Sequence, residues 1–179
     1  MGPTRSGQRA AALCALGCLV AAACDRDPTP HPDGGGDAQV EIDGGPLPHF
    51  PADFEERYEE LRDCRFSHEH DLRFIRVFAS ESASEPYQRL SPDVPYPVGA
   101  NLVKAEYDDD LCLILLEYTE MTKLEPGSYA EGGDWLWQRI NPQLEVTESG
   151  AASRCTSCHA WHCAPPNGYD WTCAEELPQ

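Results

Sequence analysis

The chain has 179 residues, with 31 Asp and Glu against 13 Lys and Arg, so its formal net charge is −18 at pH 7. A chain this acidic is repelled by polyanions, so we expect no nucleic acid partner. Once non-globular segments are set aside, the length suits one domain with a single hydrophobic core.

The first 23 residues have the pattern of a secretory signal peptide. Arg5 and Arg9 precede an apolar run from Ala10 to Ala23 that ends in small residues. The run, about 14 residues long, is shorter than the roughly 20 that a membrane span needs. Residues 21–24, AAAC, resemble a bacterial lipoprotein cleavage box, so we expect a lipid on Cys24. Ordinary cleavage near the same alanines, which frees a soluble protein, is the alternative; both predict export, and we expect a periplasmic protein.

Residues 24–49 are rich in Pro, Gly and Asp and show no apolar periodicity. This composition predicts a disordered acidic linker. The folded domain is therefore expected at residues 50–179, and no internal repeat is visible in it.

The domain begins with two segments of different periodicity. In residues 52–64, Phe54, Tyr58 and Leu61 have the spacing i, i+4, i+7, and acidic residues precede basic ones. This pattern predicts an amphipathic helix. In residues 72–80, by contrast, successive side chains fall alternately on two faces of an extended chain. This spacing predicts a strand.

The next segments favour strands. Four prolines in residues 82–99 leave room for only a short helical turn, and residues 101–107 then predict a strand. Residues 112–122 form a long apolar strand paired with it in a hairpin, and another strand covers residues 134–140. A short helix or turn is expected within residues 149–160. Four strands with a helix at each end predict an α+β domain, mainly an antiparallel β-sheet with a few short helices.

The stretch CTSCHAWHC, residues 155–163, has the densest set of chemically active side chains. Cys155 and Cys158 lie three residues apart and His159 follows, so one helical turn presents both sulfurs and the imidazole on the same side. Cys-x-x-Cys-His is the attachment signal of c-type haem, which is attached outside the cytoplasm. The sequence therefore predicts covalent haem c, with Cys155 and Cys158 bonded to the haem and His159 bound to its iron.

Two other chemistries use the same residue types. A redox dithiol is expected in a βαβ setting, which this strand-rich sequence lacks. A tetrahedral zinc site needs four ligands, and enough are present: Cys155, Cys158, His159 or His162, Cys163 and Cys173. A zinc module or a structural disulfide cluster without haem therefore stays open as an alternative.

Four cysteines remain after export, lipidation and haem attachment are assigned: Cys64, Cys112, Cys163 and Cys173. An even number in an exported protein predicts two disulfides, with three possible pairings. We favour Cys64–Cys112 with Cys163–Cys173, because the latter pair brackets a turn containing Pro-Pro and Gly.

Five segments, in order, resemble the cytochrome P-460 family, which includes the cytochromes c′-beta: RFIRVFAS, PYPVGANLVKAEY, YTEMTKL, GGDWLWQRI and CTSCH. The resemblance covers about residues 72–159. It implies a small antiparallel sheet, one c-type haem and an open distal iron site. P-460 members oxidise hydroxylamine and handle nitric oxide, whereas c′-beta members mainly bind diatomic gases.

The resemblance also implies roles for single residues. Lys104 matches a lysine that is bonded to the haem macrocycle, and Arg76 matches a distal arginine. The proton-accepting distal glutamate matches Glu120 or Glu117, which lie on opposite faces of their strand; we prefer Glu120. The alternatives are a solvated strand residue for Lys104 and an edge-strand salt bridge for Arg76.

We therefore expect a haem protein that oxidises hydroxylamine or handles nitric oxide and passes electrons to an external acceptor. The alternative is a cytochrome without turnover. It would bind a diatomic gas beneath Phe74 and Phe78, or transfer electrons with a sixth iron ligand from His68, His70 or Met121. The expected partners are a small nitrogen-oxide-type substrate or a diatomic gas, the electron acceptor, and the membrane through the lipid anchor only. A second copy of the chain, in a homodimer, is also considered as a partner. After the haem motif the chain departs from the family by two additional cysteines and Trp171.

Overall fold

The computed structural model describes residues 46–150 and 152–173. The signal peptide predicted at residues 1–23, the lipidated Cys24 and nearly all of the predicted linker lie outside these residues. Among the helices of the described ranges, none is both long enough and apolar enough to span a membrane.

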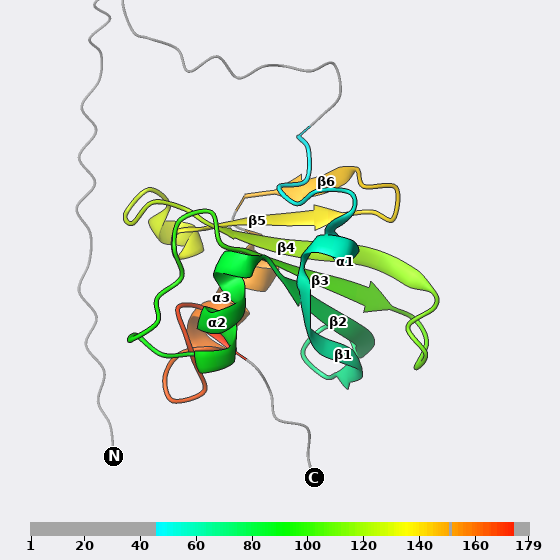
Figure 1. The fold of residues 1–179 in the computed structure, drawn as a ribbon, viewed down its shortest axis with the longest axis horizontal. Coiled ribbons are helices and arrows are strands. Elements are labelled where there is room, and N and C mark those ends of the chain that lie inside the picture. The colour runs from blue at the N-terminus through cyan, green and yellow to red at the C-terminus, as the bar shows by residue number, and fades with distance from the viewer. Residues whose placement is uncertain (1–45, 151, 174–179) are drawn as a thin grey trace, which may run out of the picture. The chain divides into compact units, whose positions relative to one another are not determined.

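Six antiparallel strands form one sheet, and each strand pairs with the next one along the chain, as Figure 1 shows. The strands are β1 (Glu59–Ser67), β2 (Arg73–Ala79), β3 (Asn101–Tyr107), β4 (Leu115–Lys123), β5 (Trp135–Ile140) and β6 (Val146–Ser149). A separate two-stranded sheet consists of β7 (Gly168–Tyr169) and β8 (Thr172–Cys173). The predicted α+β class with a mainly antiparallel sheet is confirmed.

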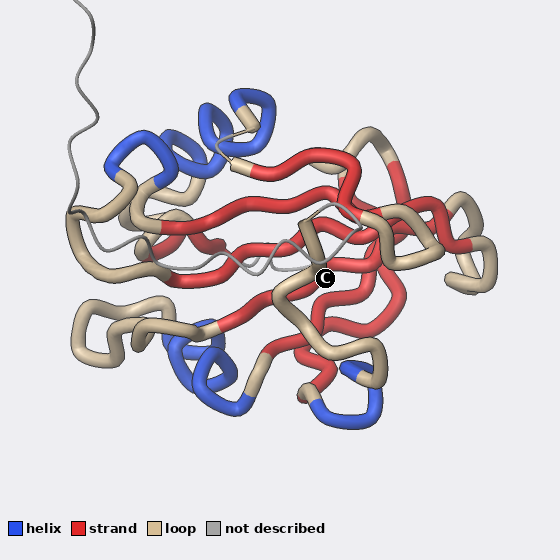
Figure 2. Tube along the Cα trace, turned by 90° about the horizontal axis from the view of Figure 1, so that it is seen from above, coloured by secondary structure: helices blue, strands red, loops and turns tan. Residues whose placement is uncertain are grey.

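The helices are short: α1 (Phe54–Arg57), α2 (Glu81–Arg89), α3 (Ser153–His162) and the 3₁₀ turn η1 (Ala130–Gly132). Seen from above, they lie around the margins of the sheet (Figure 2). Two hydrophobic clusters show which helix covers which face. Ala83 and Tyr87 of α2 and Cys155 of α3 pack in one cluster, whereas Phe54 of α1 packs in the other.

The register of the sheet assigns side chains to these two faces, because successive residues of a strand point to opposite sides. One face, which we call the α3 face, carries the aligned residues Val77, Lys104 and Thr119. The opposite face, the α1 face, carries the aligned residues Phe78, Val103 and Glu120. The residues on these faces decide which predicted side chains meet α3.

The helix predicted over residues 52–64 is wrong beyond its first turn. Helix α1 ends at Arg57, Tyr58 is extended with ψ 150°, and β1 follows directly. Phe54 is buried as the helical pattern predicted, but residues 59–67 pair with β2. Backbone pairing with another segment outweighs a local helix pattern, because a helix this short has little stability of its own.

Three further expectations differ from the structure. The strand predicted from Cys112 begins at Leu115, because the Asp109 carboxylate accepts hydrogen bonds from three backbone N–H groups, at residues 111, 113 and 114. Cys112 itself has a left-handed φ of 52°. Helix α2 is longer than the single turn expected and includes Pro86. Strand β6 was not predicted at all.

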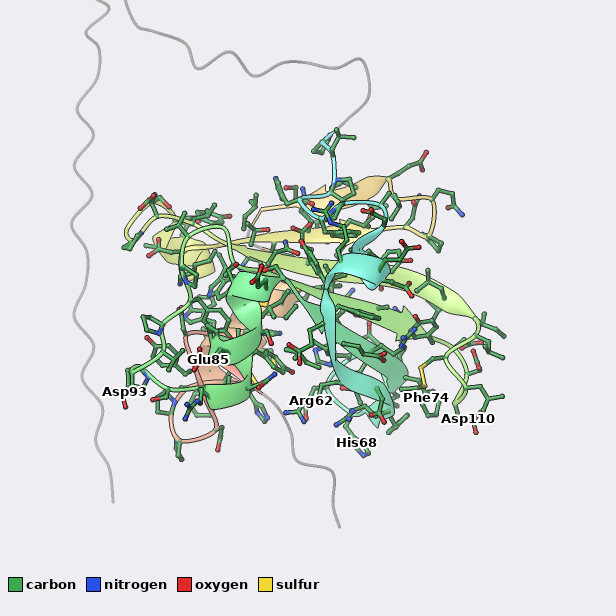
Figure 3. The ribbon with its side chains drawn as sticks, in the orientation of Figure 1. Arg62, His68, Phe74, Glu85, Asp93 and Asp110 are labelled. Atoms are coloured by element: carbon green, nitrogen blue, oxygen red, sulfur yellow. A yellow bond between two sulfur atoms is a disulfide. The ribbon has the colours of Figure 1, made fainter. Side chains whose placement is uncertain are left out.

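Both predicted disulfides are confirmed. Cys64 in β1 is bonded to Cys112 in the β3–β4 loop, and Figure 3 shows this bond in yellow near Phe74 and Asp110. Cys163 at the end of α3 is bonded to Cys173 in β8. Cys155 and Cys158 are free thiols.

Candidate functional site

A cavity of about 780 Å³ lies between α3 and the α3 face of the sheet. Its walls come mainly from strands β1 to β5, the β1–β2 turn and α3, with further residues from α2, β6 and β8. The volume falls within the range of small-molecule and cofactor pockets, roughly 300–1,000 Å³. The cavity therefore has room for a group of cofactor size.

All three residues of the predicted haem motif line this cavity. Helix α3 carries Cys155, Cys158 and His159, so residues three and four apart in sequence stand on neighbouring positions of one helical face. Burial raises the pKa of the Cys155 thiol. The helix thus presents two thiols and an imidazole to the same space, as the spacing predicted.

The His159 imidazole is held in one orientation. Its Nδ1 lies 2.8 Å from the carbonyl oxygen of Trp171, and its ring packs edge-on against Trp137 with 4.8 Å between ring centroids. Burial lowers the pKa of His159 to about 4, although the Trp171 carbonyl favours the charged form. A neutral imidazole that donates from Nδ1 to Trp171 leaves Nε2 as the metal-binding atom.

A second histidine, His70, faces the same cavity from the β1–β2 turn. Its Nδ1 lies 2.7 Å from the Ser67 hydroxyl, and its ring centroid lies 6.3 Å from that of His159. Burial, together with the nearby Lys104 and His159, lowers the pKa of His70 to about 2. His70 was one of three residues predicted as an alternative sixth ligand. The other two differ, since Met121 is buried in the cavity wall and His68 is exposed.

Lys104 also lines the cavity, from β3. Its ammonium group lies 3.1 Å from Glu106, and its side chain is 16% exposed, so it is not the solvated strand residue of the alternative interpretation. Glu106 also pairs with Arg73, which in turn pairs with Glu117. Glu117 pairs further with Arg139. A continuous line of ion pairs therefore runs across the α3 face.

The two glutamates of β4 have different surroundings. Both Glu117 and Glu120 belong to residues at the cavity wall, but the register puts only Glu117 on the face of Lys104. The Glu120 carboxylate accepts hydrogen bonds from the Asn101 side chain, the Thr122 hydroxyl and the His49 backbone N–H on the α1 face. The preferred prediction for the distal carboxylate was Glu120. In the structure it is Glu117 that lies on the face of the sheet that meets the haem motif.

Arg76 lies away from the cavity. Its guanidinium forms two hydrogen bonds with Glu60 of the neighbouring strand, and it lies 4.9 Å from the centroid of the Phe78 ring. Phe78 packs against Phe54 in the α1-face cluster. The arrangement matches the salt bridge considered as the alternative for Arg76, and it places neither Arg76 nor Phe78 opposite His159.

The side chains around the cavity fit the donor set of a c-type haem. Two free thiols are available for thioether bonds and one neutral imidazole for iron. Arg62 also lines the cavity, where its guanidinium carbon lies 5.7 Å from the centroid of the Tyr87 ring, and it is a cation that could pair with a haem carboxylate. The zinc alternative has lost two ligands, since Cys163 and Cys173 are bonded to each other. In the described ranges no group of three or more His, Cys, Asp or Glu side chains is arranged to hold a metal ion.

Comparison with known protein families finds no family that matches the chain. Comparison with curated proteins likewise finds no similar sequence. The resemblance to the cytochrome P-460 family therefore stays a prediction.

Three residues of the site were not predicted in the positions that the structure gives them. His70 was treated as one of several possible ligands, and the contact with His159, 89 positions later in the chain, has no local signal. The carbonyl that orients His159 belongs to Trp171, which was noted only as a departure from the family. Glu106 could have been found, because residues i and i+2 of a strand share a face and Lys104 was already a candidate.

Proposed function

We propose that this chain is an exported c-type cytochrome that holds one haem in the cavity between α3 and the sheet. One observation carries the proposal: Cys155, Cys158 and the neutral, hydrogen-bonded His159 line the same cavity from one helix. When bound, the haem would supply a one-electron redox centre at its iron. Export by the N-terminal segment, with a lipid on Cys24, would place the domain in the periplasm.

In this proposal the chain contributes three things. Cys155 and Cys158 would hold the haem covalently, and His159, oriented by the Trp171 carbonyl, would bind its iron. Apolar wall residues, among them Val77, Leu102, Met121 and Trp137, exclude water. Arg62 is placed to pair with a haem carboxylate at the wall nearest β1. Electrons would pass to or from an external partner.

The test is haem attachment during expression with the periplasmic haem-attachment machinery. We expect wild-type protein to retain a haem stain after denaturing electrophoresis, and the Cys155→Ala and Cys158→Ala variants to lose one thioether bond each. The double variant should lose the stain. A matched control removes the other cysteine pair, Cys64 and Cys112, and should keep it. Wild-type protein that is folded and free of haem would overturn the proposal.

A second candidate function is turnover of hydroxylamine or nitric oxide at the iron, as the family resemblance implies. Lys104 favours it, because this residue lines the cavity and could reach the haem macrocycle. The proton acceptor would then be Glu117, which shares the face of Lys104. Both Glu117 oxygens are bound, one by Arg73 and one by Arg139, so its first effect is to hold these guanidinium groups in place.

The absorption spectrum and turnover assay separate the two candidates. A lysine crosslink should give a red-shifted main band that returns to the ordinary c-type position in Lys104→Ala. The control is Lys123→Ala, since Lys123 pairs with Asp170 and does not line the cavity. Hydroxylamine oxidation with an artificial acceptor should depend on Lys104 and Glu117. An ordinary c-type spectrum, unchanged in Lys104→Ala and without turnover, would leave electron transfer as the function.

A further inference from the structure

We propose that His70 is the second axial ligand of the haem iron and binds it from the side opposite His159. This inference rests on the proposed haem site and specifies its coordination. It commits the chain to an iron with both axial positions filled by protein, whereas the family resemblance implies an open position.

The spacing of the two rings matches that of a shared metal ion. Imidazoles bound on opposite sides of one metal have centroids about 6.4 Å apart, given a metal–nitrogen bond of about 2.0 Å and about 1.2 Å from nitrogen to centroid. The centroids of His70 and His159 are 6.3 Å apart. The rings are inclined by 55°, which is acceptable because each ring can rotate about its own metal–nitrogen bond. Both rings line the cavity.

The hydrogen bonds leave the same nitrogen available on each ring. Nδ1 of His70 is bonded to the Ser67 hydroxyl, and Nδ1 of His159 to the Trp171 carbonyl. In each ring the hydrogen bond is made by Nδ1, so Nε2 is the nitrogen that can bind a metal. Metal-bound histidines typically use one ring nitrogen for the metal and the other for such a partner. The pair thus has the hydrogen bonding of two ligands.

The turn that carries His70 is fixed to the rest of the site. Asp71 and Leu72 have left-handed φ angles of 53° and 57°, and the Arg73 N–H donates to the His70 carbonyl at 3.1 Å, which closes the turn. Asp71 also pairs with Arg154 of α3 at 2.5 Å. The helix that carries His159 and the turn that carries His70 are therefore connected by a direct ion pair beside the cavity.

Other potential ligands fit the opposite side less well. Lys104 is bound to Glu106, and Met121 packs in the apolar cluster with Leu102 and Trp137. His162 lies on α3, the helix of His159. His68 is exposed, its ring packs against Phe66, and in Figure 3 it lies at the lower margin of the ribbon. His68 is therefore a matched control for His70, two residues away in the same turn.

Filled axial positions have a functional consequence. A six-coordinate site changes its ligands little between oxidation states, which suits electron transfer. A small molecule would reach the iron only after His70 leaves, so the chain would bind gases slowly. The inference therefore favours the electron-transfer function over turnover at an open site.

The experiment compares wild type, His70→Ala and His68→Ala as full haem-loaded proteins, each first checked for covalent haem. We expect a low-spin, bis-imidazole signal by absorption and electron paramagnetic resonance for wild type and His68→Ala, and a high-spin signal for His70→Ala. Added imidazole should restore the low-spin spectrum of His70→Ala. Carbon monoxide should bind ferrous His70→Ala about tenfold faster or more, because no internal ligand has to leave.

Each result decides the inference. A high-spin wild-type protein overturns it, as does a low-spin spectrum that persists in His70→Ala. The charge-transfer band of methionine-ligated ferric haem would assign the position to Met121 instead. If His70→Ala does not accumulate, the wild-type resonance spectrum still distinguishes two imidazoles from one. A folded wild-type chain that carries no haem defeats the proposed function first, so the two failures are distinguishable.

Discussion

Glu117 and Glu120 lie three residues apart in β4, yet they belong to opposite faces of the sheet and have opposite electrostatic surroundings. Glu117, on the α3 face, is bound by two arginines that continue an ion-pair line to Lys104. Glu120, on the α1 face, is 1% exposed and accepts hydrogen bonds from Asn101 and the His49 backbone, with the His49 imidazole 3.7 Å away. Glu117 therefore belongs to a network of ion pairs with arginines, whereas Glu120 is a buried carboxylate without an arginine or lysine at ion-pair distance among the described residues.

This difference indicates a division of labour between the faces. The α1 face carries a closed core in which Phe54, Phe78 and Ile140 are almost completely buried, whereas the cluster on the α3 face, which includes Leu102 and Trp137, borders the cavity. On the α3 face, the cavity proposed for the haem replaces part of the side-chain packing. Ion pairs and the disulfide at the end of α3 stabilise this region instead. Substitutions on the first face should mainly change stability, and those on the second should also change the haem site.

Phe54→Ala should have the largest effect on stability. Phe54 is 2% exposed and contacts the rings of Phe50, Phe78 and Tyr118, so its removal should lower the free energy of unfolding by about 3–5 kcal/mol. Denaturant unfolding of the haem-loaded protein measures this, and the haem spectrum should not change. The control Phe66→Ala, at a 41% exposed ring, should cost less than about 1 kcal/mol. Equal losses at both positions would contradict a core on the α1 face.

Replacing both Cys163 and Cys173 by alanine should have the next largest effect. The two residues are ten apart in sequence, and the chain-entropy argument gives about 3 kcal/mol for a loop of that length. Because Cys163 lines the cavity at the end of α3, we also expect a shift in the haem spectrum. Removal of the Cys64–Cys112 bond should destabilise the protein without that shift. Identical spectral effects of the two pairs would contradict the division between the faces.

Glu117→Gln should lower the free energy of unfolding by about 2 kcal/mol, because Arg73 and Arg139 lose their charged acceptor at a site where the Glu117 side chain is 12% exposed. The loss should shrink as salt is added, since salt screens ion pairs. The control is Glu148→Gln, 43% exposed and 3.7 Å from Arg139, which should cost about 0.5 kcal/mol or less. A loss that does not depend on salt would argue against ion pairing.

Glu120→Gln should mainly change the pH dependence. Burial raises the pKa of Glu120 above its ordinary value of 4.5, although bonds from Thr122, His49 and Asn101 oppose this. The folded state therefore holds the proton to higher pH than the unfolded chain, so wild-type stability falls as pH rises from about 4.5 through the raised pKa. The slope should reach at most about 1.4 kcal/mol per pH unit, and Glu120→Gln should lack it. Urea titrations across that pH window test the sign.

The strands and the helical turn whose own residues carry a characteristic pattern were predicted correctly from the sequence. Strand β2 alternates clearly and was found, as were β3 and β5, and the haem-motif spacing predicted a helical turn with its three residues on one side. The region after Phe54 was wrong, because β1 exists through its pairing with β2 and not through its own periodicity. The apolar run from Cys112 was assigned wholly to a strand, since neither the Asp109 hydrogen bonds nor the disulfide can be read from hydrophobicity.

The candidate site shows the same limit. Cys155, Cys158 and His159 are contiguous, so sequence alone predicted them as a group. The choice between Glu117 and Glu120 required knowing which face of β4 meets α3, and this follows only from the packed register. The position of His70 depends on a turn with two left-handed residues, Asp71 and Leu72. The residue types at these two positions do not predict that conformation. Contacts made across the fold were thus the part that the sequence could not supply.

The hydrogen bonds of residues 47 and 49 have a mechanical consequence. The Leu47 carbonyl accepts from Gln138, and the His49 N–H donates to Glu120, so the chain joins the domain on the α1 face. A pull from any N-terminal anchor would therefore load β4 and β5 from the side away from the cavity.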